Sequence, residues 1–131
     1  MSKILCMSYI HFNPNPLNKY IGDCVVRAFC AALDISWEDA YTRIAARGYV
    51  MRDMPSSNSV WDCQLVHEGF KREMLPFKDD YTVKDFCRDF PIGTYVLGTG
   101  THAVAVKDGN YLDAWDSGDE IPTYYYRKEL S

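Results

Sequence analysis

The sequence predicts a single α+β domain over residues 1–131, with a helical N-terminal half packed on an antiparallel β-sheet from the C-terminal half. The length matches one compact domain with one hydrophobic core. Apolar residues recur at helical spacing through much of the first 90 residues. From residue 94 onward, β-rich runs alternate with glycine-containing turns, which is typical of antiparallel strands.

A helix over residues 24–33 is expected at the centre of this domain. Nine of its ten residues are hydrophobic and Arg27 is the only charge, so the helix belongs inside the domain rather than on its surface. The preceding Gly-Asp pair supplies a turn and a helix start, which places Cys24 in the first turn. Upstream, residues 3–10 are compatible with a short strand, and residues 13–16 form a rigid, proline-containing lead-in.

Three further helices and a strand are expected before the sheet. Ser36 can cap a second helix, whose apolar face runs to a plausible stop at Gly48. The polar segment 52–59 then indicates a loop that could overhang a site. The remaining elements are a helix at roughly 60–68, a strand at 70–75 and a short helix after a capping box at Thr82.

The hairpin signal Asp108-Gly109 fixes how the later strands pair. If its turn has two residues, Asp113 lies on the same face of the sheet as His102. A three-residue loop would instead place Asp116 opposite His102. The two-residue turn is the commoner form, which favours Asp113. The strands expected in this half are 94–97, 102–106, 111–115 and 123–126.

Composition excludes several classes of function. A net charge of −4 gives no electrostatic reason to bind nucleic acid or an anionic membrane. The N-terminus is too short and polar for a secretory signal, and no run is long enough to span a bilayer. Five cysteines at scattered spacings predict free thiols in the cytoplasm of a bacterium or infected host cell. They show no metal-ligand spacing, so neither a metal nor a cofactor is expected.

Cys24 is the candidate nucleophile. At the start of a buried helix, unpaired N–H groups and the helix dipole favour negative charge, so the thiol should ionise more easily. A small apolar cysteine that happens to begin a core helix is the simpler interpretation of the same residue.

His102 is the candidate base because it opens a strand directly after a glycine-rich turn, and a cysteine nucleophile needs such a partner. A lone strand histidine is more often structural. Asp113, or Asp116 in the other register, would orient the imidazole. Trp115 beside them could shield the histidine–carboxylate bond from water, although an aromatic packing in the sheet explains it equally well.

An oxyanion needs preformed donors. The backbone N–H of Cys24 is one candidate. The side-chain amide of Asn18, six residues earlier, is the second, although asparagine also suits turns in general.

Together these residues resemble a papain-like cysteine peptidase in a minimal phage or bacterial form, and they are similar also to bacteriocin-processing peptidases. The resemblance implies the roles of Asn18, Cys24, His102 and Asp113 given above. The run Asp113-Ala114-Trp115 is similar to the Asn-Ser-Trp run that carries the orienting residue in papain. The likeness covers roughly residues 18–33 and 93–118. The Cys-Gly-Ser-Cys-Trp stretch of papain is absent, so no substrate subsite is carried over.

The expected function is that of an intracellular cysteine hydrolase, a peptidase or amidase acting on a protein or peptide substrate. One alternative is acyl transfer or glutamine deamidation by the same triad. The other is a catalytically silent binding or inhibitory protein that keeps the papain-like scaffold. Substrate identity and oligomeric state stay open at this point.

Overall fold

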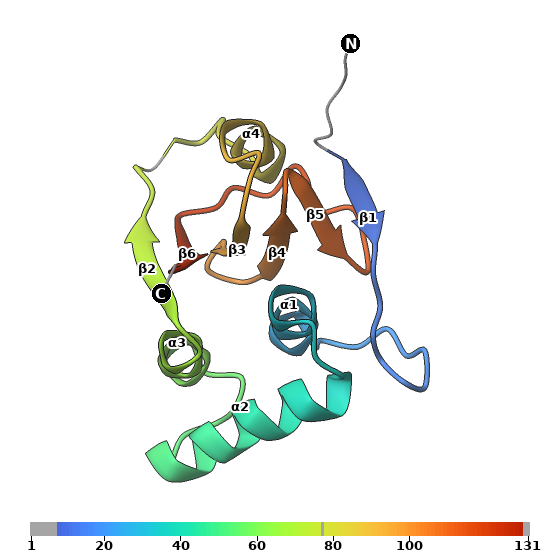
Figure 1. The fold of residues 1–131 in the computed structure, drawn as a ribbon, viewed down its shortest axis with the longest axis vertical. Helices are drawn as coiled ribbons and strands as arrows, with labels where there is room; N and C mark the ends of the chain where they lie inside the picture. The colour runs from blue at the N-terminus through green and yellow to red at the C-terminus, as the bar shows by residue number, and fades with distance from the viewer. Residues whose placement is uncertain (1–7, 77, 130–131) are drawn as a thin grey trace.

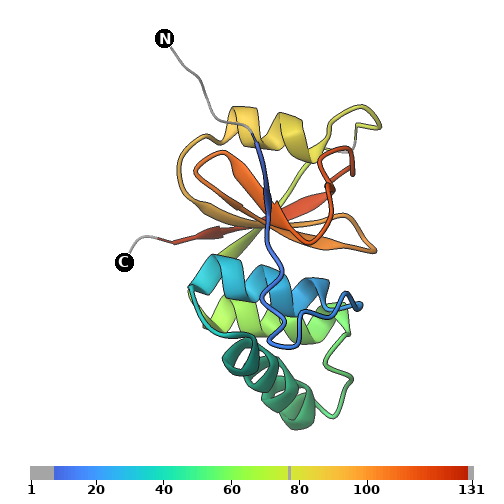
Figure 2. The ribbon, with the colours of Figure 1, turned by 90° about the vertical axis from the view of Figure 1, so that its right-hand side faces the viewer.

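Four helices and a six-stranded sheet make up the part of the chain that the computed structural model describes, residues 8–76 and 78–129 (Figure 1). The sheet has helices on both sides, as Figure 2 shows. On one side lie α1 (Cys24–Leu33), α2 (Trp37–Met51) and α3 (Asn58–His67), and on the other lies α4 (Val83–Asp89). The predicted α+β class is confirmed.

The sheet is mixed rather than purely antiparallel. Its order is β1-β5-β4-β3-β6-β2, and β3 to β6 form antiparallel pairs, as predicted for the C-terminal half. Both edge strands precede β3 in the chain: β2 pairs antiparallel with β6, and β1 pairs parallel with β5. The strands are β1 (Tyr9–His11), β2 (Phe70–Met74), β3 (Thr94–Gly98), β4 (Ala103–Lys107), β5 (Asn110–Asp113) and β6 (Tyr124–Lys128).

The strand predicted at residues 3–10 is only partly testable, because residues 3–7 lie outside the described residues. Within the described part, β1 is three residues long and ends at His11, one residue beyond the predicted limit. Such a short strand carries too little of the period-two pattern to reveal its partner. Its parallel pairing with β5 could therefore not be predicted.

Alternate residues of the central strands face opposite sides of the sheet. In β4, Ala103 and Ala105 pack in the core cluster around α1, whereas Val104 and Val106 pack in the cluster that contains α4. The two small alanines let α1 lie close to β4. This close packing places the first turn of α1 near the residue that precedes β4.

The helix starts agree with the capping signals of the sequence. The central helix α1 begins at Cys24, as predicted. The Ser36 hydroxyl accepts a first-turn backbone N–H of α2 at 3.0 Å. Thr82 and Asp85 exchange the two hydrogen bonds of a capping box at the start of α4. The third helix, α3, begins two residues before the predicted start at residue 60 and ends one residue before the predicted end at residue 68.

The predicted stop of the second helix at Gly48 is wrong. The helix continues to Met51 and ends at Arg52, which adopts a left-handed φ of 57°. Gly48 is buried inside the helix, and a Cβ there would lie 2.9 Å from the carbonyl oxygen of Asp53. The glycine therefore makes room for the returning chain rather than ending the helix.

The turn between β4 and β5 has two residues. Lys107 pairs with Asn110, and the intervening Asp108 and Gly109 have φ values of 50° and 80°. Positive φ at both central positions is the pattern of a type I′ hairpin turn. The two-residue register, which favoured Asp113 over Asp116, is confirmed.

Candidate active site

Three elements converge at the candidate active site: the start of α1, the residue before β4 and the last residue of β5. They carry Cys24, His102 and Asp113 respectively. Cys24 and His102 line the same cavity, and the His102 side chain and the Ala103 backbone favour the ionised form of the half-buried Cys24 thiol. The structure thus brings together the three residues that the sequence analysis singled out.

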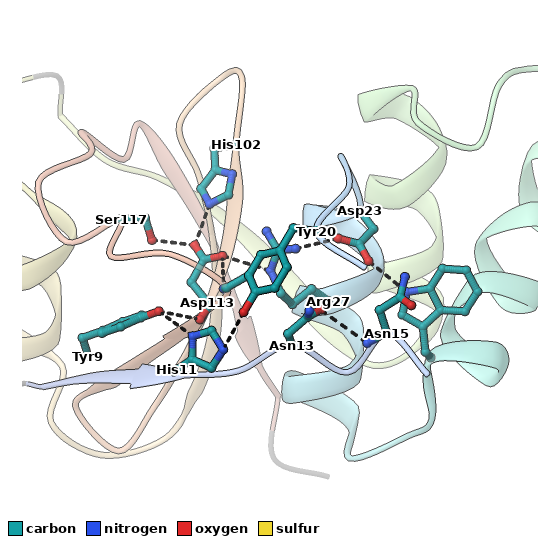
Figure 3. Close-up of polar contacts among 12 residues, drawn as sticks. Tyr9, His11, Asn13, Asn15, Tyr20, Asp23, Arg27, His102, Asp113 and Ser117 are labelled. Carbon is teal, nitrogen blue, oxygen red and sulfur yellow. Dashed lines mark hydrogen bonds and ion pairs between the residues drawn. The ribbon is translucent and has the colours of Figure 1, made fainter. Parts of the chain in front are cut away.

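The His102 imidazole is held by Asp113. Its Nε2 lies 2.6 Å from Oδ2 of the carboxylate (Figure 3). Since Nε2 is occupied in this way, Nδ1 is the ring nitrogen left for the thiol of Cys24. The carboxylate thus orients an imidazole that lines the same cavity as the thiol, which is the order of groups that nucleophilic catalysis by a cysteine uses.

The Asp113 carboxylate is buried with 0% exposure and saturated with donors. Oδ2 accepts from His102 and from the Ser117 hydroxyl, each at 2.6 Å, while Oδ1 accepts from Nε of Arg27 at 2.9 Å and the Ala114 N–H at 2.8 Å. Burial alone would raise the pKa of Asp113, but the hydrogen bonds from His102 and Ser117 outweigh it and the pKa lies below its usual range. The carboxylate is therefore ionised and fixed in orientation.

Arg27 links this carboxylate to the start of α1. Its side chain is buried, and Nη1 donates to Oδ1 of Asp23 at 2.6 Å while Nε donates to Asp113. Oδ2 of Asp23 accepts from the Trp37 indole at 3.0 Å. Arg27 is the only charge of its helix, and this role for it was not predicted from the sequence. A lone arginine in an apolar helix was itself a signal, because a buried cation needs buried acidic partners.

The charges of Cys24 and His102 stabilise one another. Burial would raise the pKa of Cys24, but hydrogen bonds from His102 and the Ala103 backbone, together with the charge of His102, hold it below its ordinary value. Burial would lower the pKa of His102, but its hydrogen bonds with Asp113 and Cys24 raise it to about 9. His102 is therefore protonated at neutral pH, and its positive charge favours the thiolate form of Cys24.

Trp115 and Asp116 occupy different surroundings. The Trp115 ring lies against the His102 ring, with centroids 4.8 Å apart, and remains 46% exposed. Asp116 instead accepts hydrogen bonds from the Tyr111 hydroxyl at 2.5 Å and from the Gly118 N–H at 3.1 Å. The carboxylate that contacts His102 is thus that of Asp113, not that of the alternative, Asp116.

Among the described residues, no hydrogen bond joins Asn18 to Cys24, His102 or Asp113. Asn18 sits exposed in a turn with a left-handed φ of 57°, and its N–H donates to the Asn15 carbonyl at 2.9 Å. It is not among the residues that line the cavity beside Cys24. This environment suits a turn-forming asparagine and gives no support to an oxyanion role. The six-residue spacing between Asn18 and Cys24 did not indicate that Asn18 would lie in a turn outside the cavity lining.

The first turn of α1 offers other donors. Cys24, Val25 and Val26 line a cavity of about 720 Å³, together with His102. The N–H of Arg27 donates to the carbonyl of Asp23, so the amides of the three earlier residues have no acceptor one turn back in the helix. Amides at a helix start can bind a developing negative charge.

His11 belongs to a separate cluster at the edge of the sheet. Its two ring nitrogens each lie 3.1 Å from a tyrosine hydroxyl, of Tyr9 and Tyr20 (Figure 3). The Tyr9 hydroxyl also donates to the backbone carbonyl of Asp113 at 3.1 Å. The cluster therefore holds the segment before α1 against the strand that carries Asp113.

Comparisons with known proteins add no relative to this picture: no family model, no curated protein and no solved structure matches the chain. Among the described residues, no group of three or more His, Cys, Asp or Glu side chains is arranged to hold a metal ion. Within the same residues, none of the helices has the length and apolarity needed to cross a membrane.

Proposed function

We propose that this protein is an intracellular cysteine hydrolase of papain-like type, a peptidase or amidase that acts on a protein or peptide substrate. Cys24 is the nucleophile, His102 the general base and acid, and Asp113 the residue that orients the imidazole. The observation that carries this proposal is that the His102 imidazole is bonded to the buried Asp113 carboxylate and lines the same cavity as the Cys24 thiol at the start of α1.

In the first half of the reaction, the Cys24 thiolate attacks the carbonyl carbon of the scissile amide. The negative charge moves to the carbonyl oxygen, where the first-turn amides of α1 stabilise it. The His102 imidazolium then gives its proton to the amide nitrogen, the C–N bond breaks and the amine leaves. The product is a thioester on Cys24 and a neutral imidazole.

The second half restores the enzyme. The neutral His102 takes a proton from water, and the resulting hydroxide attacks the thioester carbonyl. The C–S bond breaks, the substrate leaves as a carboxylic acid, and Cys24 and His102 return to the thiolate–imidazolium pair. The Asp113 carboxylate stays ionised throughout and stabilises the imidazolium. The Trp115 ring covers part of the His102 ring.

Hydrolysis in ¹⁸O-labelled water tests this proposal. A mixture of peptides from a digested proteome is incubated with the wild-type protein, Cys24→Ser or His102→Ala, and products are identified by mass spectrometry. A peptidase gives new, ¹⁸O-labelled C-termini that are absent with either variant. Labelled glutamate in place of glutamine, without cleavage, would show a deamidase using the same residues. No labelled product with the wild type would overturn the proposal and favour a silent binding protein.

A further inference from the structure

The cavity beside Cys24 and His102 is walled by the helical middle of the chain. Its lining includes Trp37, Tyr41 and Ile44 on α2, Trp61 on α3 and Tyr124 on β6. Its volume of about 720 Å³ is within the range of pockets that enclose small organic ligands, and exceeds what one small side chain fills. Because Cys24 and His102 are among the lining residues, a ligand that fills the cavity contacts the reacting groups.

Aromatic rings stack in two pairs along these walls. Trp37 and Tyr41 have ring centroids 5.0 Å apart at 23°, and Trp61 and Tyr124 have centroids 6.2 Å apart at 28°. Both indole N–H groups already have acceptors, Asp23 for Trp37 and Asn58 for Trp61. The lining therefore offers a ligand mainly apolar atoms, from these rings and from aliphatic side chains such as that of Val26.

The cavity offers little to a charged ligand. The described residues that line it include no lysine, arginine or glutamate. Asp23 is the one acid among them, and its oxygens are bonded to Arg27 and Trp37 inside the protein. Apart from Cys24, His102 and the first-turn amides of α1, which the proposed reaction uses, the lining gives a charged group no partner for the water that it loses, whereas an apolar group gains from leaving water.

Two glycines make room for parts of the wall. A Cβ on Gly98 of β3 would collide with the Tyr124 ring, so the glycine lets that ring lie flat on the sheet. A Cβ on Gly48 of α2 would come within 3.2 Å of the backbone nitrogen of Pro55, another lining residue. Two parts of the cavity lining, Tyr124 and Pro55, thus pack closely against glycines of the fold.

We infer that this cavity is a specificity pocket for a large apolar side chain, aromatic or branched aliphatic, of the residue next to the scissile amide. The inference rests on the proposed function for its link to catalysis, but binding in the pocket can be measured without catalysis. Neutral apolar peptides are the substrate class that the pocket selects, and peptides with an acidic or basic residue at the same position bind more weakly.

Peptide binding to a variant that lacks the thiol tests the pocket separately from the chemistry. In Cys24→Ala combined with Trp115→Phe, the two remaining tryptophans, Trp37 and Trp61, both line the pocket. Their fluorescence is titrated with capped tripeptides Ala-Xaa-Ala in which Xaa is Phe, Leu, Asp or Lys. We expect the Phe and Leu peptides to bind at least about tenfold more tightly than the Asp and Lys peptides. Equal affinities, or no saturable change with Phe, would overturn the inference, whatever the ¹⁸O experiment shows.

A charge placed in the pocket gives the converse test. Tyr41 lines the pocket and is 49% exposed, so Tyr41→Asp should fold; Tyr49, on the same helix but not among the lining residues, is 73% exposed and provides the matched control. Added to the double variant, Tyr41→Asp should weaken binding of the Phe peptide and make the Lys peptide the tighter ligand. Tyr49→Asp should leave the order unchanged. The same effect from both substitutions, or none from Tyr41→Asp, would contradict the assignment.

Discussion

Arg27 and Asp113 form a buried ion pair, with Nε of the guanidinium 2.9 Å from Oδ1 of the carboxylate. Arg27 lies in the same helix as Cys24, and Asp113 holds His102 through its other oxygen. The pair therefore fixes the helix that carries the nucleophile relative to the strand that positions the base. Arg27 also binds Asp23, the residue before Cys24. One guanidinium therefore contacts both the start of the nucleophile helix and the carboxylate that holds His102.

Removing this guanidinium should lower the free energy of unfolding. Arg27→Met leaves the carboxylates of Asp23 and Asp113 buried without their cation, so we expect the free energy of unfolding to fall by about 3–5 kcal/mol. Arg27→Lys keeps the charge but cannot bind both acids in the same geometry, so it should lose less. Urea denaturation of the two variants measures both values. Wild-type stability in Arg27→Met would mean that the ion pair contributes nothing net.

The two aspartates near the hairpin should differ sharply. Both oxygens of Asp113 accept from N–H or O–H donors, so the amide nitrogen of Asp113→Asn would face a donor in either orientation. We expect peptide hydrolysis to fall by about 10²-fold or more, because the imidazole loses its orientation. Asp116→Ala loses its bond to Tyr111 and should leave the rate nearly unchanged. A greater loss with Asp116→Ala would refute the assignment of Asp113.

Substitutions of Asn18 distinguish its two possible roles, as a turn former and as an oxyanion donor. If the residue only supports a left-handed turn, Asn18→Gly should be neutral, while Asn18→Ala should cost about 1 kcal/mol of folding free energy. Neither substitution should change the rate at which Cys24 is acylated. The check is thermal unfolding together with single-turnover acylation by a p-nitrophenyl ester. A large rate loss with unchanged stability would restore Asn18 as an oxyanion donor.

The pair of His102 and Asp113 should make stability depend on pH. The pKa of His102 is raised in the folded protein to about 9 from an ordinary 6.5, so its protonation stabilises the fold fully below pH 6.5. This contribution is lost as the pH rises through about 9. The unfolding free energy of the wild type relative to His102→Gln, measured in urea across this range, should therefore decrease with rising pH. A difference that is flat from pH 6 to pH 10 would contradict the raised pKa.

Local signals in the sequence predicted the parts of the fold that local chemistry determines. The apolar run of α1, the hydroxyl caps at Ser36 and Thr82 and the Asp108-Gly109 turn each depend on a few adjacent residues. The hairpin register then placed Asp113 beside His102 from a count of residues alone.

The features that were missed depend on distant parts of the chain. Gly48 resembles a helix stop in sequence, but its role is set by the loop that returns across it. The partners of Arg27 lie four residues before it and 86 residues after it, and only the folded sheet brings the second one close. Ser117, which holds the other oxygen of Asp113, follows the hairpin in an irregular segment without a recognisable pattern.

The central claim, that Cys24 is an activated thiolate, can be measured by a short pulse of iodoacetamide at mildly acidic pH. Burial raises the pKa of Cys30 to about 11 and that of Cys87 to about 12, so both should react slowly. Cys63, half-buried on α3, provides a reference within the same molecule.

Mass spectrometry of the tryptic peptides reads these sites together. Among the four described cysteines, we predict rapid labelling of Cys24 alone. His102→Ala should remove most of this advantage, because the imidazolium that stabilises the thiolate is lost. Uniform labelling of the cysteines, or a Cys24 rate that is unchanged in His102→Ala, would contradict the thiolate–imidazolium pair on which the proposed function depends.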